Sequence, residues 1–353
     1  MNSGRSTGRC IALDAMGGAD APAIVVEGAQ LARQRHPGLR FLLFGDEVQL
    51  RSLVDRQAGL AEAVEVCHAE QVIDDADKPS QALRRGRQSS MRLAIDAVDD
   101  GRADAVVSAG NTGALMAMAK VVLRMQEGIV RPAMITFFPT LAGRSAMLDL
   151  GANIECDVDN LVQFAIMGAA FARIELGKER PTVGLLNVGS EDLKGNETVK
   201  TAGQILRDSD LDFEFHGFVE GDDIGAGTVD VFVTDGFTGN IALKAVEGTS
   251  RLYTGFLNQA FRSSLLAGLG YFLARPAFNA VRRRVDPREH NGAMFVGLNG
   301  VVIKSHGGTD SIGFANAVGV ALDMVEERFK ERIQADLRRW APAAQPEAEA
   351  AVS

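Results

Sequence analysis

The chain has 353 residues, 46% of them hydrophobic and 24% charged, and its mean hydropathy is close to zero. These values are typical of a soluble globular protein with one large core or two lobes. The net charge of -9 argues against nucleic acid as the main partner, because binding to a phosphate backbone needs a positive surface. Cys10, Cys67 and Cys156 form no C-x-x-C pair, which argues against a disulfide framework or a zinc site and indicates a reducing compartment.

The N-terminus has no apolar signal region, and the longest uncharged apolar stretch, residues 263–274, is too short to span a bilayer. We therefore expect a cytoplasmic protein. Residues 1–8 and the Ala-, Pro- and Glu-rich residues 341–353 are expected to be disordered, and residues 9–340 to form one catalytic α/β domain with two lobes.

Along the chain, short apolar runs alternate with longer segments of helical period. The runs predict strands at residues 11–13, 41–44, 64–67, 105–107, 134–137, 146–148, 183–187, 214–218 and 231–234, and the intervening segments predict helices such as 24–35, 48–57 and 159–176. This order is typical of an α/β fold with a largely parallel sheet and flanking helices. Its ligand crevice is expected at the carboxyl ends of the strands.

Gly-rich turns follow several of these predicted strands. In residues 230–244, DVFVTDGFTGNIALK, an apolar run meets an Asp-Gly turn and restarts as a helix, and residues 106–120 repeat the design. The free amides and the dipole of a helix N-terminus can hold an anion there. The polar and glycine residues concerned are Ser108, Gly110, Asn111, Thr112 and Gly113 in one turn, and Asp235, Gly236, Thr238, Gly239 and Asn240 in the other. We expect the turns to converge on one crevice.

Residues 245–288 depart from the pattern. They predict a helical insertion that breaks near Gly268 and Gly270 and again at Pro276. Its apolar residues, which include Leu265, Leu266 and Phe272, must be buried against another surface. Two alternatives stay open, and both can hold on different faces: packing against a second copy in a dimer, and contact with a membrane interface, with Arg282, Arg283 and Arg284 on anionic headgroups.

No familiar catalytic motif is present: there is no G-x-G-x-x-G, G-x-x-x-x-G-K-[ST], H-E-x-x-H or G-x-S-x-G string. The predicted crevice instead holds amides, hydroxyls and a few charged groups, which suit an oxyanion or a phosphate. The charged and amide residues concerned are Asp14, Asn153, Lys194, Asn196, Asp235, Lys304, Ser305 and His306. A transferase that uses phosphate fits this set.

Each of these residues also has a structural alternative. Asp14 and Asp235 are equally suited to cap helices or brace turns, and Lys194 before Gly195 is equally suited to be a solvated loop lysine. The asparagines beside glycines can serve as turn residues with left-handed backbone. His306 is either a crevice group or a turn histidine.

Six collinear strings make the assignment more specific. LDAMGG (13–18), SAGNTGALMA (108–117), LDLGAN (148–153), LLNVGSEDLKGNE (185–197), TDGFTGNIALK (234–244) and GLNGVVIKSHG (297–307) resemble the phosphate acyltransferase family of bacterial phospholipid synthesis. The similarity runs from about Ile11 to Phe329, nearly the whole chain. The family's first motif usually has Asp directly after the double glycine, whereas here Ala19 follows Gly18 and the acid is Asp20, so we assign no role to Asp20.

The resemblance implies a reaction and partners. An acyl group moves from acyl carrier protein to inorganic phosphate, giving acyl phosphate for phosphatidic acid synthesis, with no metal or cofactor. The resemblance also implies a fold similar to phosphotransacetylases and isopropylmalate dehydrogenase, a homodimer attached peripherally to the inner face of the cell membrane, and a downstream glycerol-3-phosphate acyltransferase.

Within that reaction, Lys304, His306, Lys194, Asp235 and Asn240 are the expected catalytic residues. Lys304 and Lys194 would stabilise the developing oxyanion and His306 would protonate the leaving thiolate. The expected substrate and phosphate contacts are Asp14, Gly17, Gly18, Ser108, Gly110, Asn111, Thr112, Gly113, Asn153, Asn196, Gly236, Thr238, Gly239 and Ser305.

The acidic carrier needs a basic docking patch, because the whole chain is acidic too. Arg282, Arg283, Arg284 and Arg288 are the densest cluster, and Arg84, Arg85 and Arg87 the second. Two other functions remain open: a metal-dependent decarboxylating dehydrogenase on the same fold, for which the motifs offer few Mg²⁺ ligands, and a membrane-recruited scaffold without catalysis.

Overall fold

The computed structural model describes residues 8–284, 286, 288, 289 and 291–340, without the side chains of residues 280 and 282–284. The expected disorder of residues 1–7 and 341–353, and the expected side-chain contacts of Arg282, Arg283 and Arg284, lie outside the described part. Gly8 is described.

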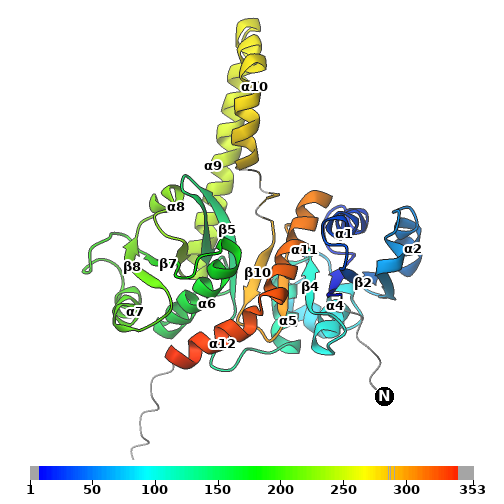
Figure 1. Ribbon diagram of the computed structural model, residues 1–353, viewed down its shortest axis with the longest axis horizontal. Coiled ribbons are helices and arrows are strands. Elements are labelled where there is room, and N and C mark those ends of the chain that lie inside the picture. Colours follow the sequence, from blue (N-terminus) through cyan, green and yellow to red (C-terminus); the bar gives the residue numbers. More distant parts are fainter. Residues whose placement is uncertain (1–7, 285, 287, 290, 341–353) are drawn as a thin grey trace, which may run out of the picture.

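Strands and helices alternate along most of the chain (Figure 1). The strands are β1 (Cys10–Asp14), β2 (Arg40–Gly45), β3 (Val64–His68), β4 (Ala105–Ser108), β5 (Ala133–Thr140), β6 (Gly143–Leu148), β7 (Thr182–Leu186), β8 (Glu214–Val219), β9 (Val231–Val233), β10 (Ala293–Val296) and β11 (Val301–Lys304). The helices are α1 (Ala23–Arg35), α2 (Glu47–Val54), η1 (Ala61–Ala63), α3 (Pro79–Arg85), α4 (Ser90–Asp99), α5 (Thr112–Val122), α6 (Val158–Leu176), α7 (Glu197–Asp208), α8 (Asp223–Ala226), α9 (Gly236–Arg262), α10 (Leu265–Arg284), α11 (Ser311–Glu326) and α12 (Phe329–Trp340).

All eleven strands join one sheet in the order β3-β2-β1-β4-β11-β10-β5-β6-β9-β7-β8. The strands of each half run parallel to one another, which confirms the largely parallel α/β fold predicted from the sequence. Three antiparallel pairings, β11 with β10, β10 with β5 and β5 with β6, lie between the halves. Because three reversals leave a net reversal, β6, β9, β7 and β8 run opposite to β1, β4 and β11.

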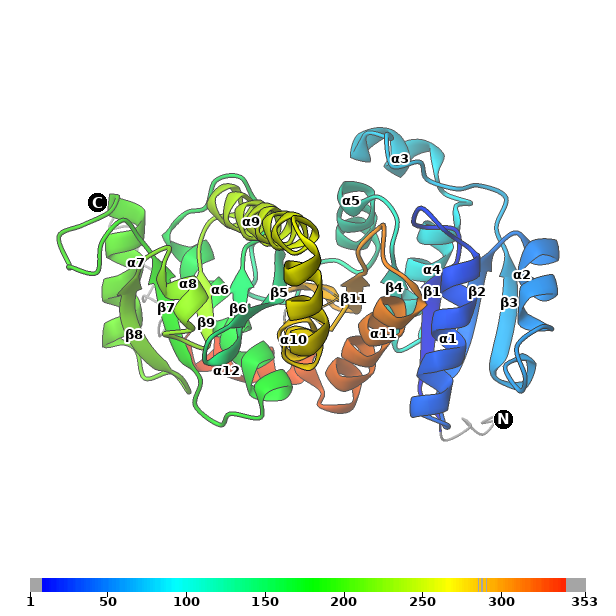
Figure 2. The same cartoon turned by 90° about the horizontal axis from the view of Figure 1, so that it is seen from above.

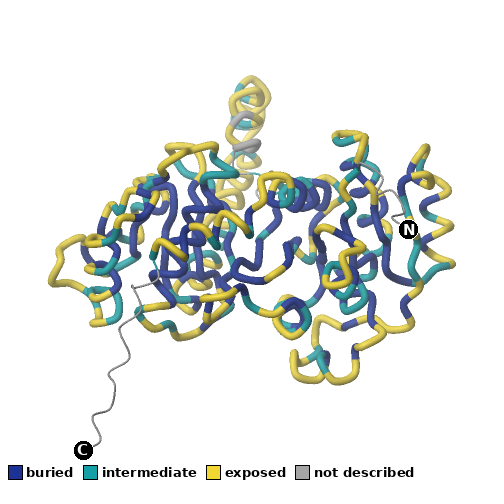
Figure 3. The backbone as a smooth tube through the Cα atoms, turned by 60° about the horizontal axis from the view of Figure 1, so that its bottom comes forward, coloured by how far each residue is buried: buried dark blue, intermediate teal, exposed yellow. Residues whose placement is uncertain are grey.

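The sheet is covered on both faces, as the apolar composition of its central strands requires. On one face, Ile11, Leu13 and Val107 pack with α1, α6 and α11 in the main core cluster. On the other, Ala12 and Val106 pack with α3, α4 and α5. Figure 3 shows this buried interior as a continuous band through both halves of the molecule.

The insertion after β9 is a long helical hairpin that projects away from the sheet (Figure 1). Its first helix, α9, begins at Gly236 and not at residue 245, so the Gly-rich turn and the hairpin belong to one helix. The breaks predicted at Gly268, Gly270 and Pro276 are wrong, because α10 runs unbroken through all three. The chain reverses at Ser263 and Ser264 instead, where Ser263 Oγ donates to Ala260 O and Ser264 Oγ accepts from Ala267 N.

Three aromatic rings hold the hairpin together. Phe261 on α9 packs against Tyr271 and Phe278 on α10, with ring centroids 5.1 and 5.0 Å away, and Tyr271 and Phe278 lie 5.5 Å apart. Other apolar side chains remain uncovered: Leu265 is 95% exposed, Leu266 81% and Phe272 67%. Figure 3 shows the hairpin as mostly exposed, in contrast to the helices on the sheet.

Candidate active site

Asp14 is the centre of a buried polar group at the carboxyl ends of β1 and β4. Its side chain is almost fully buried and accepts from Ser90 Oγ at Oδ1 and from Ser108 Oγ at Oδ2, both at 2.6 Å. Burial raises the pKa of Asp14, and the hydroxyls of Ser108 and Ser90 and the charge of Lys304 oppose that shift. Asp14 is therefore more than a turn brace, since its two bonds join three elements.

Glycines allow three loops to meet beside Asp14. A Cβ on Gly17 would lie 2.6 Å from both Asp14 Oδ2 and Gly110 N, and one on Gly18 would lie 3.2 Å from Gly307 O. Gly18 also has a φ of 106°, which favours glycine. Ala19 N donates to Gly307 O at 2.9 Å. The loops after β1, β4 and β11 are thus in direct contact, as the sequence motifs predict.

Lys304 ends β11 within this group. Its Nζ donates to Ala109 O at 3.2 Å and to Ser305 O, so two of its three protons are bound to carbonyls. Burial lowers the pKa of Lys304 to about 8, although the charges of Asp75 and Asp14 oppose the shift. Among the described residues, only these two carbonyls accept from the ammonium group, which leaves its third proton for a ligand.

The N-terminus of α5 is built by Asn111. Its Oδ1 accepts from Ala114 N at 2.9 Å, and its Nδ2 donates to the carbonyls of residues 74, 75 and 77. Asn111 therefore caps the helix and braces the loop before α3, and its amide is already bonded. Thr112 and Gly113 form the first turn, where backbone amides are free to bind an anion.

His306 follows Lys304 and is exposed. Gly308 N donates to its Nδ1 at 3.1 Å. Its backbone N donates to Asn291 Oδ1 at 2.8 Å. Ser305, between Lys304 and His306, is fully buried and accepts at Oγ from Asn291 Nδ2.

A second group surrounds Asp149 after β6. This buried carboxylate accepts from the backbone N of Met134, Gly151, Ala152 and Asn153 and from Asn153 Nδ2, at 2.6–3.2 Å. Burial raises the pKa of Asp149, and these donors oppose the shift. Asn153 also donates to Pro132 O. Asn153 is thus a structural amide of the turn.

The same group holds the N-terminus of α9. Asp235 caps that helix, accepting from Thr238 N at 2.9 Å and Thr238 Oγ1 at 2.8 Å. Gly236 and Gly239 are required, because a Cβ on either would collide with the loop at Asp149 and Asn153. Asn240 is exposed and lies beside Gly151.

Lys194 and Asn196 belong to neither group. They lie on the loop after β7, where Asn187 Nδ2 donates to Gly189 O and Lys194 O. Asn196 is the N-cap of α7 and accepts from Val199 N. The Lys194 side chain is exposed, and within the described part of the chain it has no ion pair.

The motifs lie on both halves of the sheet, whose strands run in opposite directions. The loops after β1, β4 and β11 share one end of the sheet, whereas β6, β7 and β9 run the other way. Among the described residues, no hydrogen bond or ion pair joins the Asp14 group to the Asp149 group. Figure 2 shows α5 and α9, whose N-termini belong to the two groups, on the same side of the sheet.

Three residues that matter here were not among the sequence candidates. Ser90 follows the N-cap Ser89 of α4, so a local pattern explains it only as a helix start. Asp149 lies in the motif LDLGAN (148–153), but the sequence pattern predicted no role for it. Asn291 lies in a segment without any motif. Only the through-space contacts reveal them.

The docking candidates are placed differently. Arg84, Arg85 and Arg87 are exposed around the end of α3, which packs against α5, and Arg87 borders a surface hollow with Leu83, Arg92, Asp96 and Val121. Arg288 bonds to Asp286 and Asp310, which raises its pKa further above the usual range. Its part in carrier docking stays a prediction.

The family comparison matches almost the whole chain. Residues 10–332 match the family described as "Fatty acid synthesis protein". The phosphate acyltransferase of Rhodospirillum centenum is 61% identical over 330 residues, covering 94% of this chain and 93% of the relative. That of Paramagnetospirillum magneticum is 56% identical over 333 residues, covering 94% and 95%.

Solved structures agree on the fold. A phosphotransacetylase from Streptococcus pyogenes matches with a TM-score of 0.62 at 17% identity, covering 91% of this chain and 94% of that one. The EutD phosphotransacetylase from Staphylococcus aureus matches with a TM-score of 0.58 at 17% identity, covering 91% and 95%. The expected likeness to phosphotransacetylases is confirmed at the level of the fold.

Proposed function

The chain belongs to the fatty acid synthesis protein family and is an acyltransferase with phosphate as acceptor, and we propose that its donor is the thioester of an acyl carrier protein. The observation that carries the activity is the 61% identity to a phosphate acyltransferase across almost the full length of both chains. The product is an acyl phosphate, which suits a supply route to phosphatidic acid. The dehydrogenase and scaffold alternatives have no comparable support.

Phosphate binds, in this proposal, at the N-terminus of α5 beside Lys304. The first-turn amides of α5 offer donors and the positive end of the helix dipole. Lys304 adds a charge whose remaining proton is free for an oxygen of the anion. Both oxygens of Asp14 accept from serines, and the charges of Asp75 and Asp14 oppose the burial that lowers the pKa of Lys304.

The reaction then needs positioning more than a strong base. A phosphate oxygen attacks the thioester carbonyl, the new C–O bond forms and the C–S bond breaks. The oxyanion formed on the way is stabilised by helix amides, with Lys304 nearby. The attacking hydrogen phosphate loses its proton as the acyl phosphate forms, and the departing thiolate takes up a proton to become the thiol. Nε2–H of His306, whose Nδ1 accepts from Gly308 N, donates a hydrogen bond to the departing sulfur.

The Asp149 group serves the thioester in this scheme. Asp235 and Thr238 fix the first turn of α9, and Asn240 lies exposed on that turn with an amide available to a carbonyl oxygen. Two positive helix ends would thus face the two negatively charged parts of the transition state. Lys194, exposed on a separate loop, is assigned to carrier contact and not to chemistry.

The hairpin is the proposed attachment device. Exposed Leu265 and Leu266 at its turn suit a membrane interface, and the exposed faces of α9 and α10 suit the same hairpin of a second copy. No helix in the described part of the chain is long and apolar enough to cross a bilayer. A peripheral position would deliver acyl phosphate to a membrane-bound glycerol-3-phosphate acyltransferase.

Product trapping tests the function. Purified protein is incubated with palmitoyl-acyl carrier protein and inorganic phosphate, and acyl phosphate is captured with hydroxylamine as the hydroxamate. We expect phosphate-dependent hydroxamate from the wild type, a loss of at least tenfold in Lys304→Met and little change in Lys120→Met, an exposed lysine on α5. Absence of phosphate-dependent product would sink the proposal.

A further inference from the structure

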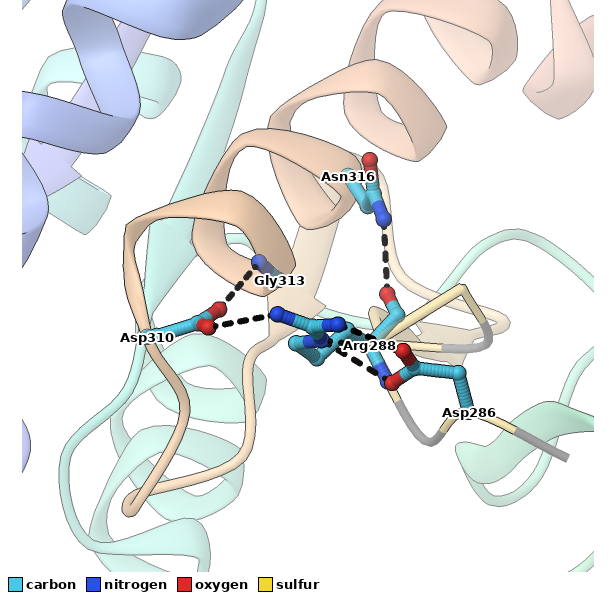
Figure 4. Close-up of polar contacts among 5 residues, drawn as sticks. All are labelled: Asp286, Arg288, Asp310, Gly313 and Asn316. Atoms are coloured by element: carbon cyan, nitrogen blue, oxygen red, sulfur yellow. Dashed lines mark hydrogen bonds and ion pairs between the residues drawn. The ribbon is translucent and has the colours of Figure 1, made fainter. Parts of the chain in front are cut away.

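The segment that follows α10 is fastened to the loop that carries His306. Figure 4 shows Arg288 between two aspartates: its Nη2 donates to Asp286 at 2.7 Å and its Nη1 to Asp310 at 3.0 Å. Asp310 is the N-cap of α11 and accepts from Gly313 N. Asn316 Nδ2, one turn further along α11, donates to Arg288 O at 2.7 Å. The segment that follows α10 is therefore bonded to the start of α11.

Asn291 extends this fastening to the candidate active site. Its side chain is 8% exposed, and its hydrogen bonds to described residues go to the 305–313 region. Nδ2 donates to Ser305 Oγ at 2.9 Å and to Gly313 O at 2.7 Å, and Oδ1 accepts from His306 N at 2.8 Å. One amide thus holds the hydroxyl before His306, the backbone of His306 itself and the first turn of α11.

The ring of His306 has a defined orientation as a result. Gly308 N donates to Nδ1, so in the neutral ring the proton is on Nε2. That bond exists only while the backbone at residues 306–308 keeps its turn. Asn291 fixes the first residue of this turn through the His306 N–H.

We propose that Asn291 is a positioning residue, which aims the Nε2–H of His306 at the substrate by holding the backbone of the 305–308 turn. The proposal rests on the proposed role of His306 in acyl transfer. It does not need contact between Asn291 and substrate, since Asn291 is buried behind Ser305. The adjacent Gly292 supports the arrangement: with a φ of 118° and a Cβ position only 3.0 Å from Ala317 Cα, the segment packs directly on α11.

Kinetics of two matched variants test the proposal. Asn291→Ala removes the bonds to the turn, whereas Asn316→Ala removes the bond from α11 to the same segment and the bond from Arg35 on α1, without touching residues 305–308. We expect kcat to fall about tenfold to a hundredfold in Asn291→Ala, with the KM for phosphate within threefold of wild type. Asn316→Ala should keep kcat within threefold. Melting temperatures measured alongside show whether the two lose similar stability.

A second readout does not depend on activity. Nitrogen NMR of ¹⁵N-histidine protein, with His306 identified by its loss in His306→Gln, reports which ring nitrogen carries the proton. The wild type and Asn316→Ala should show the Nε2–H tautomer, and Asn291→Ala a mixture. Asn291→Asp keeps the acceptor for His306 N and should retain more of the wild-type signal and rate than Asn291→Ala; it also serves if the alanine variant does not fold.

The outcomes separate the two proposals. Equal losses of kcat in Asn291→Ala and Asn316→Ala, or an unchanged tautomer in Asn291→Ala, overturn the positioning role. If the wild type forms no acyl phosphate, the proposed function fails, and the tautomer spectra alone decide whether Asn291 positions the ring.

Discussion

At the scale of single residues, Lys304 links burial to a measurable pH dependence. Its pKa is lowered to about 8 chiefly by burial, so the ammonium loses its proton as the pH rises through that value. An anion bound to the ammonium is then released. We expect the KM for phosphate to rise about tenfold per pH unit above pH 8, because one proton is required for binding. Initial rates at pH 7 to 9.5 measure this, and a KM that stays flat to pH 9.5 would contradict the assigned role.

The residue scale also shows what the sequence can and cannot predict. Asp14, Lys304 and the glycines at positions 17, 18 and 110 were expected at one site, and they lie together because each follows a strand of the same half-sheet. Ser90 could not be predicted, since it reaches Asp14 from a helix 76 residues away. Asn111 and Asn153 were expected as ligand contacts, but their amides are bonded to backbone carbonyls.

At the scale of elements, substitutions in the hairpin can test membrane attachment separately from acyl transfer. Each leucine that becomes fully buried contributes about 1.5–3 kcal/mol. A Leu265→Asp and Leu266→Asp double variant should therefore lose at least tenfold in affinity for anionic phospholipid vesicles. Acyl transfer to phosphate in solution should stay within twofold, because these side chains lie at the far end of the hairpin from α9's N-terminus (Figure 1).

The control for the hairpin is Leu141→Asp, a leucine that is 89% exposed on the β5–β6 turn. It should bind vesicles as the wild type does. Sedimentation of all variants shows whether a dimer persists. Equal vesicle binding by the double variant and the wild type would rule out the turn as the membrane contact.

The element scale is where sequence prediction succeeded best and failed most clearly. All nine predicted strands are present, since apolar runs bounded by Gly-rich turns report burial directly. The hairpin's breaks were misplaced because Gly and Pro were taken as local stops. In α10 they lie in an unbroken helix, and two serines make the turn.

At the scale of the whole molecule, the sheet's reversal could not be predicted, because strand direction depends on pairing between distant segments. β10 and β11, which follow the hairpin in the chain, insert between β4 and β5 in the sheet. This insertion places Lys304 next to Ser108, and the antiparallel pairing of β5 with β6 then reverses the second half. The motifs therefore lie on two half-sheets of opposite direction, and the single crevice expected for them stays a prediction.

A buried acid couples stability to pH. Glu175 on α6 is buried near Asp323, and burial followed by that neighbouring charge raises the pKa of Glu175 to about 7, with Arg144 opposing. The folded state therefore disfavours the ionised form. The free-energy cost of ionising Glu175 in the folded state is absent below about pH 4.5, grows as the pH rises towards 7 and is constant above. The protein therefore loses stability as the pH rises from about 4.5 to 7.

Glu175→Gln removes that cost. Relative to the wild type, the free energy of unfolding of the variant should improve by about 1–3 kcal/mol between pH 4.5 and pH 8. Glu27→Gln, an exposed glutamate on α1, should show no such trend. Urea unfolding at both pH values measures the difference, and parallel behaviour of the two variants would refute the burial argument.

The central claim is that phosphate binds at the Asp14 group through Lys304 and the N-terminus of α5. Its most direct measurement is phosphate binding, by ³¹P NMR titration or calorimetry, to the wild type, Lys304→Met and Lys120→Met at pH 7. We predict that Lys304→Met binds phosphate at least tenfold more weakly while Lys120→Met matches the wild type. Equal affinity of all three proteins would contradict the account and move the phosphate site to the Asp149 group.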